Sequence, residues 1–211
     1  MRVLVIGGAG YIGSIVASQL LDAGHEVVVL DNLSQGHRAA VHPDTELREV
    51  DILDAPALTA AAGDGFDAAM HFAALALVSE SVAHPERYWR TNVCGSLNVL
   101  DALRAGGVPR LVFSSTCATY GLPESVPMDE STPTAPVNPY GATKLTVDRM
   151  IGDHCAAHGL AAVSLRYFNV AGARGPFGED HDPETHLIPN LLRAATGQLE
   201  RQHHVFDGRQ R

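Results

Sequence analysis

Residues 2–13 of this chain read RVLVIGGAGYIG, and this stretch decides the fold. Its first part, VLVI at residues 3–6, is an unbroken apolar run rich in β-branched side chains, as expected for a short strand buried on both faces. Glycines follow directly, and apolar residues then recur at helical spacing. These recurring residues are Ile12, Val16, Leu20 and Leu21. The segment therefore predicts the first strand of a parallel sheet, a glycine turn and a helix.

The glycine turn matches the pattern G-x-G-x-x-G at Gly8, Gly10 and Gly13. In dinucleotide-binding proteins such glycines let the backbone approach a pyrophosphate, and the following helix N-terminus directs its amides and dipole at the phosphates. A second buried run, EVVVL at residues 26–30, ends in Asp31, 18 residues beyond Gly13. An acid at about this spacing binds the adenosine ribose hydroxyls and repels a 2′-phosphate.

This order of strand, turn, helix, strand and acid predicts that the cofactor is NAD. The alternative is a glycine turn that serves only the conformational needs of the backbone. Arg38 is the main hint of NADP, but it follows Asp31 at a distance and is expected on a loop surface. Residues 32–38 are polar and rich in turn formers, and we expect them to form a loop over the adenosine.

The composition describes an acidic globular chain. Of the 211 residues, 45% are hydrophobic and 18% are charged, and the formal net charge is −9. No basic stripe is present to neutralise nucleic-acid phosphates, and no apolar run has membrane-spanning length, so neither nucleic acid nor a membrane is an expected partner. Cys94, Cys117 and Cys155 lack the spacing of a zinc site or a disulfide framework. With no leader before the first strand, the sequence predicts a cytoplasmic protein.

Two further strands are expected to end beside the cofactor, because ligands bind at the carboxyl edge of open parallel sheets. Residues 47–50 form a short strand before Asp51, and Asp54 is expected to cap the next helix. Asp51 is either a cofactor ligand or an ordinary loop aspartate. Residues 67–72, DAAMHF, form a fourth strand. Within it, His71 is expected to pack in the core rather than to act as an acid or a base.

A long helix is expected over residues 85–103. Its apolar stripe is formed by Trp89, Val93, Leu97, Leu100 and Leu103. Asn92 lies off this stripe, so its amide either reaches the nicotinamide side of the cofactor or is solvated. A fifth strand at residues 110–113 runs into a row of three hydroxyl side chains at the ligand edge. These are Ser114, Ser115 and Thr116.

The strongest catalytic signal is the pair Tyr140 and Lys144 at the start of a helix, after a long proline-rich loop over residues 117–139. All 15 basic residues except Lys144 are arginine, and this single lysine lies four residues after a tyrosine, where the two share one helix face. An ammonium about 4 Å from a phenol contributes on the order of 4 kcal/mol at an effective dielectric constant of about 20. We therefore expect Lys144 to lower the pKa of Tyr140 toward neutrality.

The last part of the chain supplies a sixth strand at residues 162–165, with polar and aromatic residues directly after it. Residues 178–186, GEDHDPETH, resemble a metal cluster in composition, but their spacing favours a loop that covers the substrate. A final helix is expected over residues 186–195, and the tail from Gln198 is polar and irregular.

In order along the chain, these segments resemble the sequence blocks of the extended short-chain dehydrogenase/reductases that act on nucleotide sugars, most closely the 4-epimerases of UDP-glucose and UDP-galactose. The blocks are GGAGYIGS, DNLSQGHR, HFAA, SSTCATYG, NPYGATK, RYFNVAGA and GEDHDPETHLIP. The resemblance implies an α/β fold with a doubly wound parallel sheet, the Rossmann fold, in an NAD-binding domain over residues 1–170. Residues 171–211 are then a partial substrate-binding region. Family members continue well beyond this point, so we expect a fragment or a shortened gene in which the C-terminal substrate domain is largely missing.

The resemblance also implies a set of site residues. The expected catalytic residues are Thr116, Tyr140 and Lys144. The residues expected to bind NAD are Gly7, Gly10, Tyr11, Ile12, Gly13, Asp31, Asn32, Ser34, Asp51, Ile52, Phe72, Ala73, Ala74, Asn92, Ser114, Tyr140, Lys144 and Tyr167. Those expected to bind a UDP-sugar are Thr116, Tyr140, Phe168, Asn169, His186 and Leu187. No metal is expected.

In the family mechanism that the resemblance implies, Tyr140 takes the proton of the sugar C4 hydroxyl while hydride passes to NAD, and the 4-keto sugar turns over and receives hydride on its other face. Related dehydratases and decarboxylases have an acid directly after the position of Thr116; Cys117 stands there instead, which favours the epimerase. The resemblance also implies a homodimer through the helices that start near Pro85 and Tyr140. The alternatives are a non-catalytic NAD-binding module and another NAD-dependent enzyme that modifies nucleotide sugars. The preferred sugar is left open.

Overall fold

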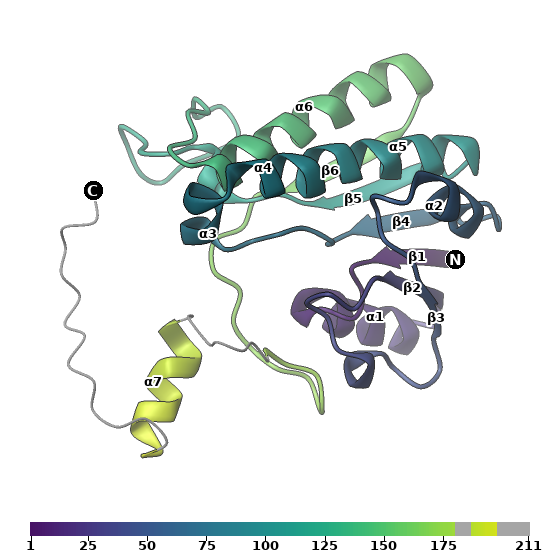
Figure 1. The fold of residues 1–211 in the computed structure, drawn as a ribbon, viewed down its shortest axis with the longest axis horizontal. Helices are drawn as coiled ribbons and strands as arrows, with labels where there is room; N and C mark the ends of the chain where they lie inside the picture. The colour runs from purple at the N-terminus through teal and green to yellow at the C-terminus, as the bar shows by residue number, and fades with distance from the viewer. Residues whose placement is uncertain (180–186, 198–211) are drawn as a thin grey trace. The chain divides into compact units, whose positions relative to one another are not determined.

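The sheet of this protein is parallel throughout in the computed structural model, which describes residues 1–179 and 187–197. Within these residues the strands follow the order β3-β2-β1-β4-β5-β6 (Figure 1). Their bounds are β1 (Arg2–Ile6), β2 (Glu26–Asp31), β3 (Glu46–Glu49), β4 (Ala68–His71), β5 (Arg110–Ser114) and β6 (Ala161–Leu165). The predicted doubly wound parallel sheet is confirmed, with strand ends that differ from the predicted ones by a residue or two.

The side of the sheet to which successive strands are added changes between β1 and β4. Strands β1, β2 and β3 are added toward one edge, and β4, β5 and β6 are added toward the other. In such sheets a crevice opens at the carboxyl ends of the strands where the order reverses. The fold therefore places the segments after β1, β2 and β4 side by side at one edge.

Helices cover the sheet unequally (Figure 1). The α-helices are α1 (Tyr11–Asp22), α2 (Ala55–Ala62), α3 (Val78–Ala83), α4 (Pro85–Tyr88), α5 (Gly95–Ala105), α6 (Pro139–His158) and α7 (Leu187–Ala195). Between α4 and α5 the chain is π-helical at η2 (Trp89–Cys94), and short 3₁₀ turns occur at η1 (Arg38–Ala40) and η3 (Cys117–Thr119). The larger apolar core lies between the sheet and helices α2, α5 and α6, and a smaller one lies under α1.

The buried face of α1 differs from the predicted one. Small side chains are buried, namely Gly13, Ser14, Ala17 and Ser18, whereas the predicted stripe of Ile12, Val16, Leu20 and Leu21 is only half-buried. A Cβ atom on Gly13 would lie 2.2 Å from the carbonyl oxygen of Gly7. The helix is therefore pressed so closely against the glycine turn that only small residues fit on the inner face, and the larger apolar side chains lie at its margin.

The predicted helix over residues 85–103 exists, but it is not a uniform α-helix. A π-helical turn holds one more residue than an α-helical turn, so it rotates the residues that follow it about the helix axis. Trp89 and Leu97 are consequently 42% and 43% exposed, while Leu100, Leu103 and Asn92 are buried. The prediction of one continuous apolar stripe is wrong, and so is the solvated alternative for Asn92.

The structure divides into two compact units, Met1–Val170 and Ala171–Arg211. The first unit contains the whole sheet. In the described part of the second unit, Arg174 and Phe177 form an isolated antiparallel bridge, and α7 presents exposed apolar side chains at Leu187, Ile188, Leu191 and Leu192. Leu187 is thus the first residue of a helix, whereas His186 lies outside the described residues.

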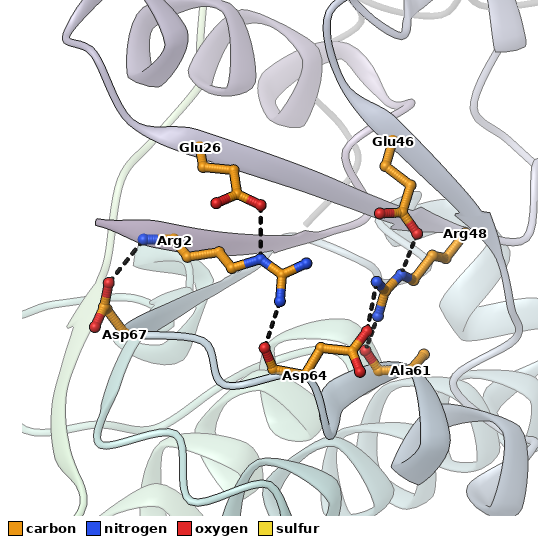
Figure 2. Close-up of polar contacts among 7 residues, drawn as sticks. All are labelled: Arg2, Glu26, Glu46, Arg48, Ala61, Asp64 and Asp67. Carbon is orange, nitrogen blue, oxygen red and sulfur yellow. Dashed lines mark hydrogen bonds and ion pairs between the residues drawn. The ribbon is translucent and has the colours of Figure 1, made fainter.

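Arg2 ties together the amino ends of three strands, at the edge of the sheet opposite the carboxyl ends (Figure 2). Its Nε atom donates to Glu26 at 2.7 Å, its backbone amide donates to Asp67 at 2.7 Å, and a terminal nitrogen donates to the carbonyl of Asp64. The guanidinium also lies over the ring of Phe66, 4.7 Å from its centroid. These contacts join β1 to β2 and to the segment that leads into β4.

Arg48, in β3, holds the end of α2 to the same edge (Figure 2). It is bonded to Glu46 at 2.8 Å, to Asp64 at 2.6 Å and to the carbonyl oxygen of Ala61 at 2.6 Å. Its guanidinium is 5.7 Å from the centroid of the Phe66 ring, so Phe66 contacts two arginines. Hydrogen bonding to Arg48 is the main cause that lowers the pKa of Glu46.

We expect Arg48→Lys to lower the free energy of unfolding by about 1–2 kcal/mol, because an ammonium replaces a planar fork that serves three oxygens at once. Urea unfolding followed by circular dichroism measures the change. The matched control is Arg38→Lys, since Arg38 forms one exposed ion pair with Glu49 and its replacement should cost less than about 0.5 kcal/mol. Equal unfolding midpoints for the two variants would contradict this prediction.

Candidate functional site

A pocket of about 240 Å³ lies at the carboxyl ends of β1, β2 and β4, where the strand order reverses. Ten residues predicted to bind the cofactor line it: Gly7, Gly10, Asp31, Asn32, Ser34, Asp51, Ile52, Phe72, Ala73 and Ala74. The predicted site thus comes together from four separate segments of the chain. It does so because all of these segments follow parallel strands and meet at one edge.

The glycine turn contacts the end of β4 without any intervening side chain. Gly7 has a φ of +82°, and a Cβ atom there would lie 2.4 Å from the amide nitrogen of Ala73. Any other residue would both strain the backbone and displace the segment that follows β4. At Gly10 a Cβ atom would meet nothing closer than 3.5 Å, so the protein itself leaves space beside the backbone here.

Two carboxylates line the pocket, and each is held by the backbone around it. Asp31 is 8% exposed and accepts hydrogen bonds from the amides of Ala9, at 3.0 Å, and Leu33, at 2.8 Å. Asp51 accepts from the side chain of Asn32 at 2.9 Å and from the amide of Leu53 at 2.8 Å. Each carboxylate oxygen has lone pairs left for ribose hydroxyls. The residues present therefore fit the adenosine half of a dinucleotide.

Sequence reasoning missed several residues that line the same pocket, namely Leu30, Gln35, Gly36, Val50, Leu53, Leu75, Arg87 and Thr91. Most of them are neighbours of predicted residues. Arg87 and Thr91 are different, because they come from α4 and η2 and no local motif marks them. They are four residues apart on a continuous helical stretch, and only the tertiary fold brings that stretch to the pocket.

Asn92 holds the pocket wall to α6. It is 1% exposed, its Oδ1 accepts from the amide of Leu75 at 2.8 Å, and its Nδ2 donates to the carbonyl of Leu75 at 3.0 Å. The same nitrogen lies 3.2 Å from the hydroxyl oxygen of Thr143. The amide is thus engaged by the protein, which gives it a positioning role for the segment after β4.

A second cluster follows β5 at the same edge of the sheet. The Nζ atom of Lys144 donates to the carbonyl oxygen of Ser114 at 2.7 Å, and the hydroxyl groups of Ser114 and Tyr167 share a hydrogen bond. The side chain of Thr116 is near enough to Tyr140 to lower the pKa of its phenol. These five residues were all predicted to belong to the site, and the structure brings them together from β5, α6 and the end of β6.

Local sequence at the start of α6 explains how Tyr140 reaches Thr116. Asn138 caps the helix by accepting from the amide of Gly141 at 2.8 Å, and Pro139 occupies the first turn. A Cβ atom at Gly141 would lie 2.6 Å from the carbonyl oxygen of Ala118. The first turn of α6 therefore packs directly against the segment that follows β5.

The ionisation of Tyr140 differs from the prediction. Burial is the largest influence and raises the pKa of its phenol, while the hydrogen bond from Thr116 lowers it. Burial also lowers the pKa of Lys144 to about 8, and the negative charge of Asp148 acts in the opposite direction. The expectation that Lys144 would bring the phenol near neutral pKa is therefore wrong for this structure, because desolvation outweighs any such attraction.

His71 is a core residue, as predicted. Its ring is 2% exposed, packs 5.5 Å from Phe113 and shares a hydrogen bond of 2.9 Å between Nε2 and the hydroxyl of Ser96. Burial and the nearby charge of Lys144 lower its pKa to about 3. The imidazole is therefore neutral at physiological pH and is not a proton donor there.

The predicted substrate residues are less well assembled than the cofactor residues. Phe168 is 66% exposed, and Asn169 is also exposed. Leu187 belongs to the second unit. Tyr11, Ile12 and Gly13, predicted to bind the cofactor, form the first turn of α1 but do not line the pocket.

Most of the segment 178–186, which was weighed as a metal cluster, lies outside the described residues. Within residues 1–179 and 187–197, no three histidine, cysteine or acidic side chains gather as a metal site would require. No helix in those same ranges is both long enough and apolar enough to cross a membrane.

Comparisons with known proteins agree with this geometry. The UDP-glucose 4-epimerase of Corynebacterium glutamicum is 54% identical over 201 residues, which are 95% of this chain and 61% of that protein. The crystal structure of UDP-glucose 4-epimerase from Brucella ovis in complex with NAD has a TM-score of 0.91 and 48% identity, and it covers 94% of this chain and 62% of that one. This chain therefore spans about three fifths of the length of these relatives.

A structure of UDP-glucose-4-epimerase from Stenotrophomonas maltophila, with bound NAD and formylated UDP-arabinopyranose, has a TM-score of 0.89 and 37% identity, covering 94% of this chain and 63% of that one. The match to a family is more extensive still, since it runs over residues 3–211. With its parallel sheet, glycine turn and acid-lined pocket, this chain belongs to the NAD dependent epimerase/dehydratase family.

Proposed function

We propose that this chain forms the NAD-binding part of a UDP-sugar 4-epimerase, with Tyr140 as the base and UDP-glucose or UDP-galactose as the substrate. The observation that carries the proposal is the cluster of Thr116, Tyr140, Ser114, Tyr167 and Lys144 at the same sheet edge as the acid-lined pocket. The relatives named above are UDP-glucose 4-epimerases, two of them with NAD bound.

The proposed role of each site residue follows from its position. Asp31 and Asp51 would hold the adenosine ribose, and the glycine turn would face the diphosphate. When bound, NAD supplies the hydride acceptor and a positively charged ring. The side chain of Thr116 acts on the phenol of Tyr140, so one sugar hydroxyl could contact both. Tyr140 would accept the proton of that hydroxyl and later return it.

Lys144 is suited to support this proton transfer even though its pKa is lowered. With a pKa of about 8, its side chain is still mostly an ammonium at pH 7. It is 3% exposed and anchored by the carbonyl oxygen of Ser114, which fixes its charge at the sheet edge. A positive charge at this edge would act against the effect of burial on the phenol, although burial remains the larger influence.

Cys117 argues against the dehydratase alternative. By resemblance, the related dehydratases have an acid directly after the position of Thr116, whereas Cys117 presents a thiol whose pKa is raised by burial. A thiol with a raised pKa stays protonated at neutral pH and does not replace a carboxylate. The epimerase proposal needs no acid at this position.

Tyr140→Phe should reduce turnover at least about 100-fold, because it removes the group that accepts the proton. Interconversion of UDP-galactose and UDP-glucose in a coupled assay measures the loss. The matched control is Tyr120→Phe, since Tyr120 is buried and its hydroxyl interacts with Arg166. Equal turnover by the Tyr140→Phe variant and the unsubstituted chain would rule out Tyr140 as the base.

The same assay separates the two classes of function. A chain that binds NAD but converts neither UDP-glucose nor UDP-galactose would support the non-catalytic NAD-binding module. A chain that converts another nucleotide sugar instead would keep the mechanism and change the substrate.

Lys144→Met should stabilise the chain at pH 7 when no NAD is added. A folded-state pKa of about 8 against the ordinary lysine value of 10.5 disfavours folding by about 3 kcal/mol at pH 7. Loss of the hydrogen bond to Ser114 offsets about 1 kcal/mol of the gain from removing this charge. The unfolded chain binds the extra proton between these pKa values, so the stability of the unsubstituted chain rises from pH 8 to pH 10.5 and the difference shrinks. Urea titrations across this range measure it; a difference independent of pH would contradict the prediction.

We also propose that the chain forms a homodimer through the helical stretch that starts at Pro85 and through α6. Trp89 and Leu97 are exposed apolar residues eight positions apart on that stretch, an arrangement that favours helix pairing. Trp89→Glu should therefore convert the dimer to a monomer in sedimentation velocity, whereas the control Leu122→Glu, at an 85% exposed loop position, should not. A chain that sediments as a monomer without any substitution would refute the homodimer.

A further inference from the structure

The charges that line the cofactor pocket are unbalanced. Of the described residues that line it, Asp31 and Asp51 are acidic and only Arg87 is basic. The dinucleotide proposed above carries two negative charges on its diphosphate. Binding it would therefore place two further anionic groups in a pocket that already contains two carboxylates, and like charges repel strongly where water is excluded.

The glycine turn supplies only part of the compensation. The amide of Ala9, inside the turn, already donates to Asp31 at 3.0 Å, and the amide of Gly10 points at the carbonyl oxygen of Gly7 at 3.4 Å. The first turn of α1 contains no basic side chain. A cation from another part of the fold would offset more of the negative charge.

Arg87 is positioned to supply that cation. It lies in α4, lines the pocket together with Thr91 one turn later, and its side chain is 53% exposed. One terminal nitrogen, Nη1, is paired with Glu80. The other oxygen of Glu80 accepts a hydrogen bond of 2.9 Å from the hydroxyl of Tyr88.

This arrangement restrains Arg87 without saturating it. A guanidinium has five N–H donors in a planar fork, and the ion pair with Glu80 uses one terminal nitrogen. The remaining edge has the geometry that binds two phosphate oxygens side by side. Because Glu80 is held by Tyr88 as well, it fixes the direction in which Arg87 leaves α4.

We propose that Arg87 binds the diphosphate of the dinucleotide and that it is the cationic group on which cofactor affinity depends. The proposal rests on the NAD binding proposed above and adds to it a residue outside the glycine turn. The competing interpretation is that Arg87 serves only the ion pair with Glu80 on the protein surface.

The test is a set of equilibrium titrations of the whole chain with three ligands: NAD, ADP-ribose and adenosine. Arg87→Gln should weaken binding of NAD and of ADP-ribose about tenfold, equal to about 1.4 kcal/mol, and leave adenosine within about twofold. Arg87→Lys should recover only part of the affinity, because it keeps the charge but loses the planar fork that holds two oxygens. The control Arg104→Gln removes an equal charge at an exposed ion pair with Asp101, away from the pocket, and should change none of the three.

Salt dependence gives a readout that a structural role would not change. The Kd of the unsubstituted chain for ADP-ribose should rise with ionic strength, and Arg87→Gln should show a weaker rise because one screened charge pair is missing. Thermal melting of each variant confirms folding.

Unchanged affinity and salt dependence in Arg87→Gln, while the unsubstituted chain binds NAD, would overturn the role of Arg87 alone. An equal loss for adenosine would do the same, because the effect would not come from the diphosphate. If the unsubstituted chain binds neither NAD nor ADP-ribose, the proposed cofactor site fails, and the role of Arg87 fails with it.

Discussion

The contact between the glycine turn and the end of β4 is the constraint on which the site depends. A Cβ atom at Gly7 would lie 2.4 Å from the amide nitrogen of Ala73, and one at Gly13 would lie 2.2 Å from the carbonyl oxygen of Gly7. Three backbone segments are therefore in direct contact where the strand order reverses. This contact sets the height of α1 above the sheet, brings Ala73 to the pocket wall and leaves Gly10 open toward a ligand.

Stability and chemistry oppose each other at Lys144. Its ammonium is 3% exposed, and desolvation lowers its pKa to about 8, so the folded chain tolerates a charge that an apolar side chain would avoid. The same burial acts on Tyr140 and raises its pKa. Lys144 is held at the carboxyl edge of β5 by Ser114, and the side chain of Thr116 acts on the phenol of Tyr140 at the same edge. Buried groups with shifted pKa values are typical of sites that transfer protons.

Local patterns predicted the fold and most of the pocket, and particular residues show why. Asp54 was predicted to cap a helix and does so by accepting from the amide of Ala57 at 3.1 Å, since a cap involves only neighbours in sequence. The apolar stripe of residues 85–103 was wrong because a π-helical turn rotates it, and no local pattern marks that turn. The lowered pKa expected for Tyr140 was wrong because the attraction of one charge could be estimated from spacing, whereas the depth of burial could not.

By itself, the sequence determined the parallel α/β fold, the glycine turn, the acid after β2 and the pairing of Tyr140 with Lys144 on one helix, because each of these follows from the order and spacing of neighbouring residues. Only the tertiary structure decided that Arg87 and Thr91 join the pocket and that Asn92 is used inside the protein. It also decided the ionisation of Tyr140 and Lys144. The physical reason is that desolvation and contacts between distant segments depend on how the chain packs, which spacing along the chain does not specify.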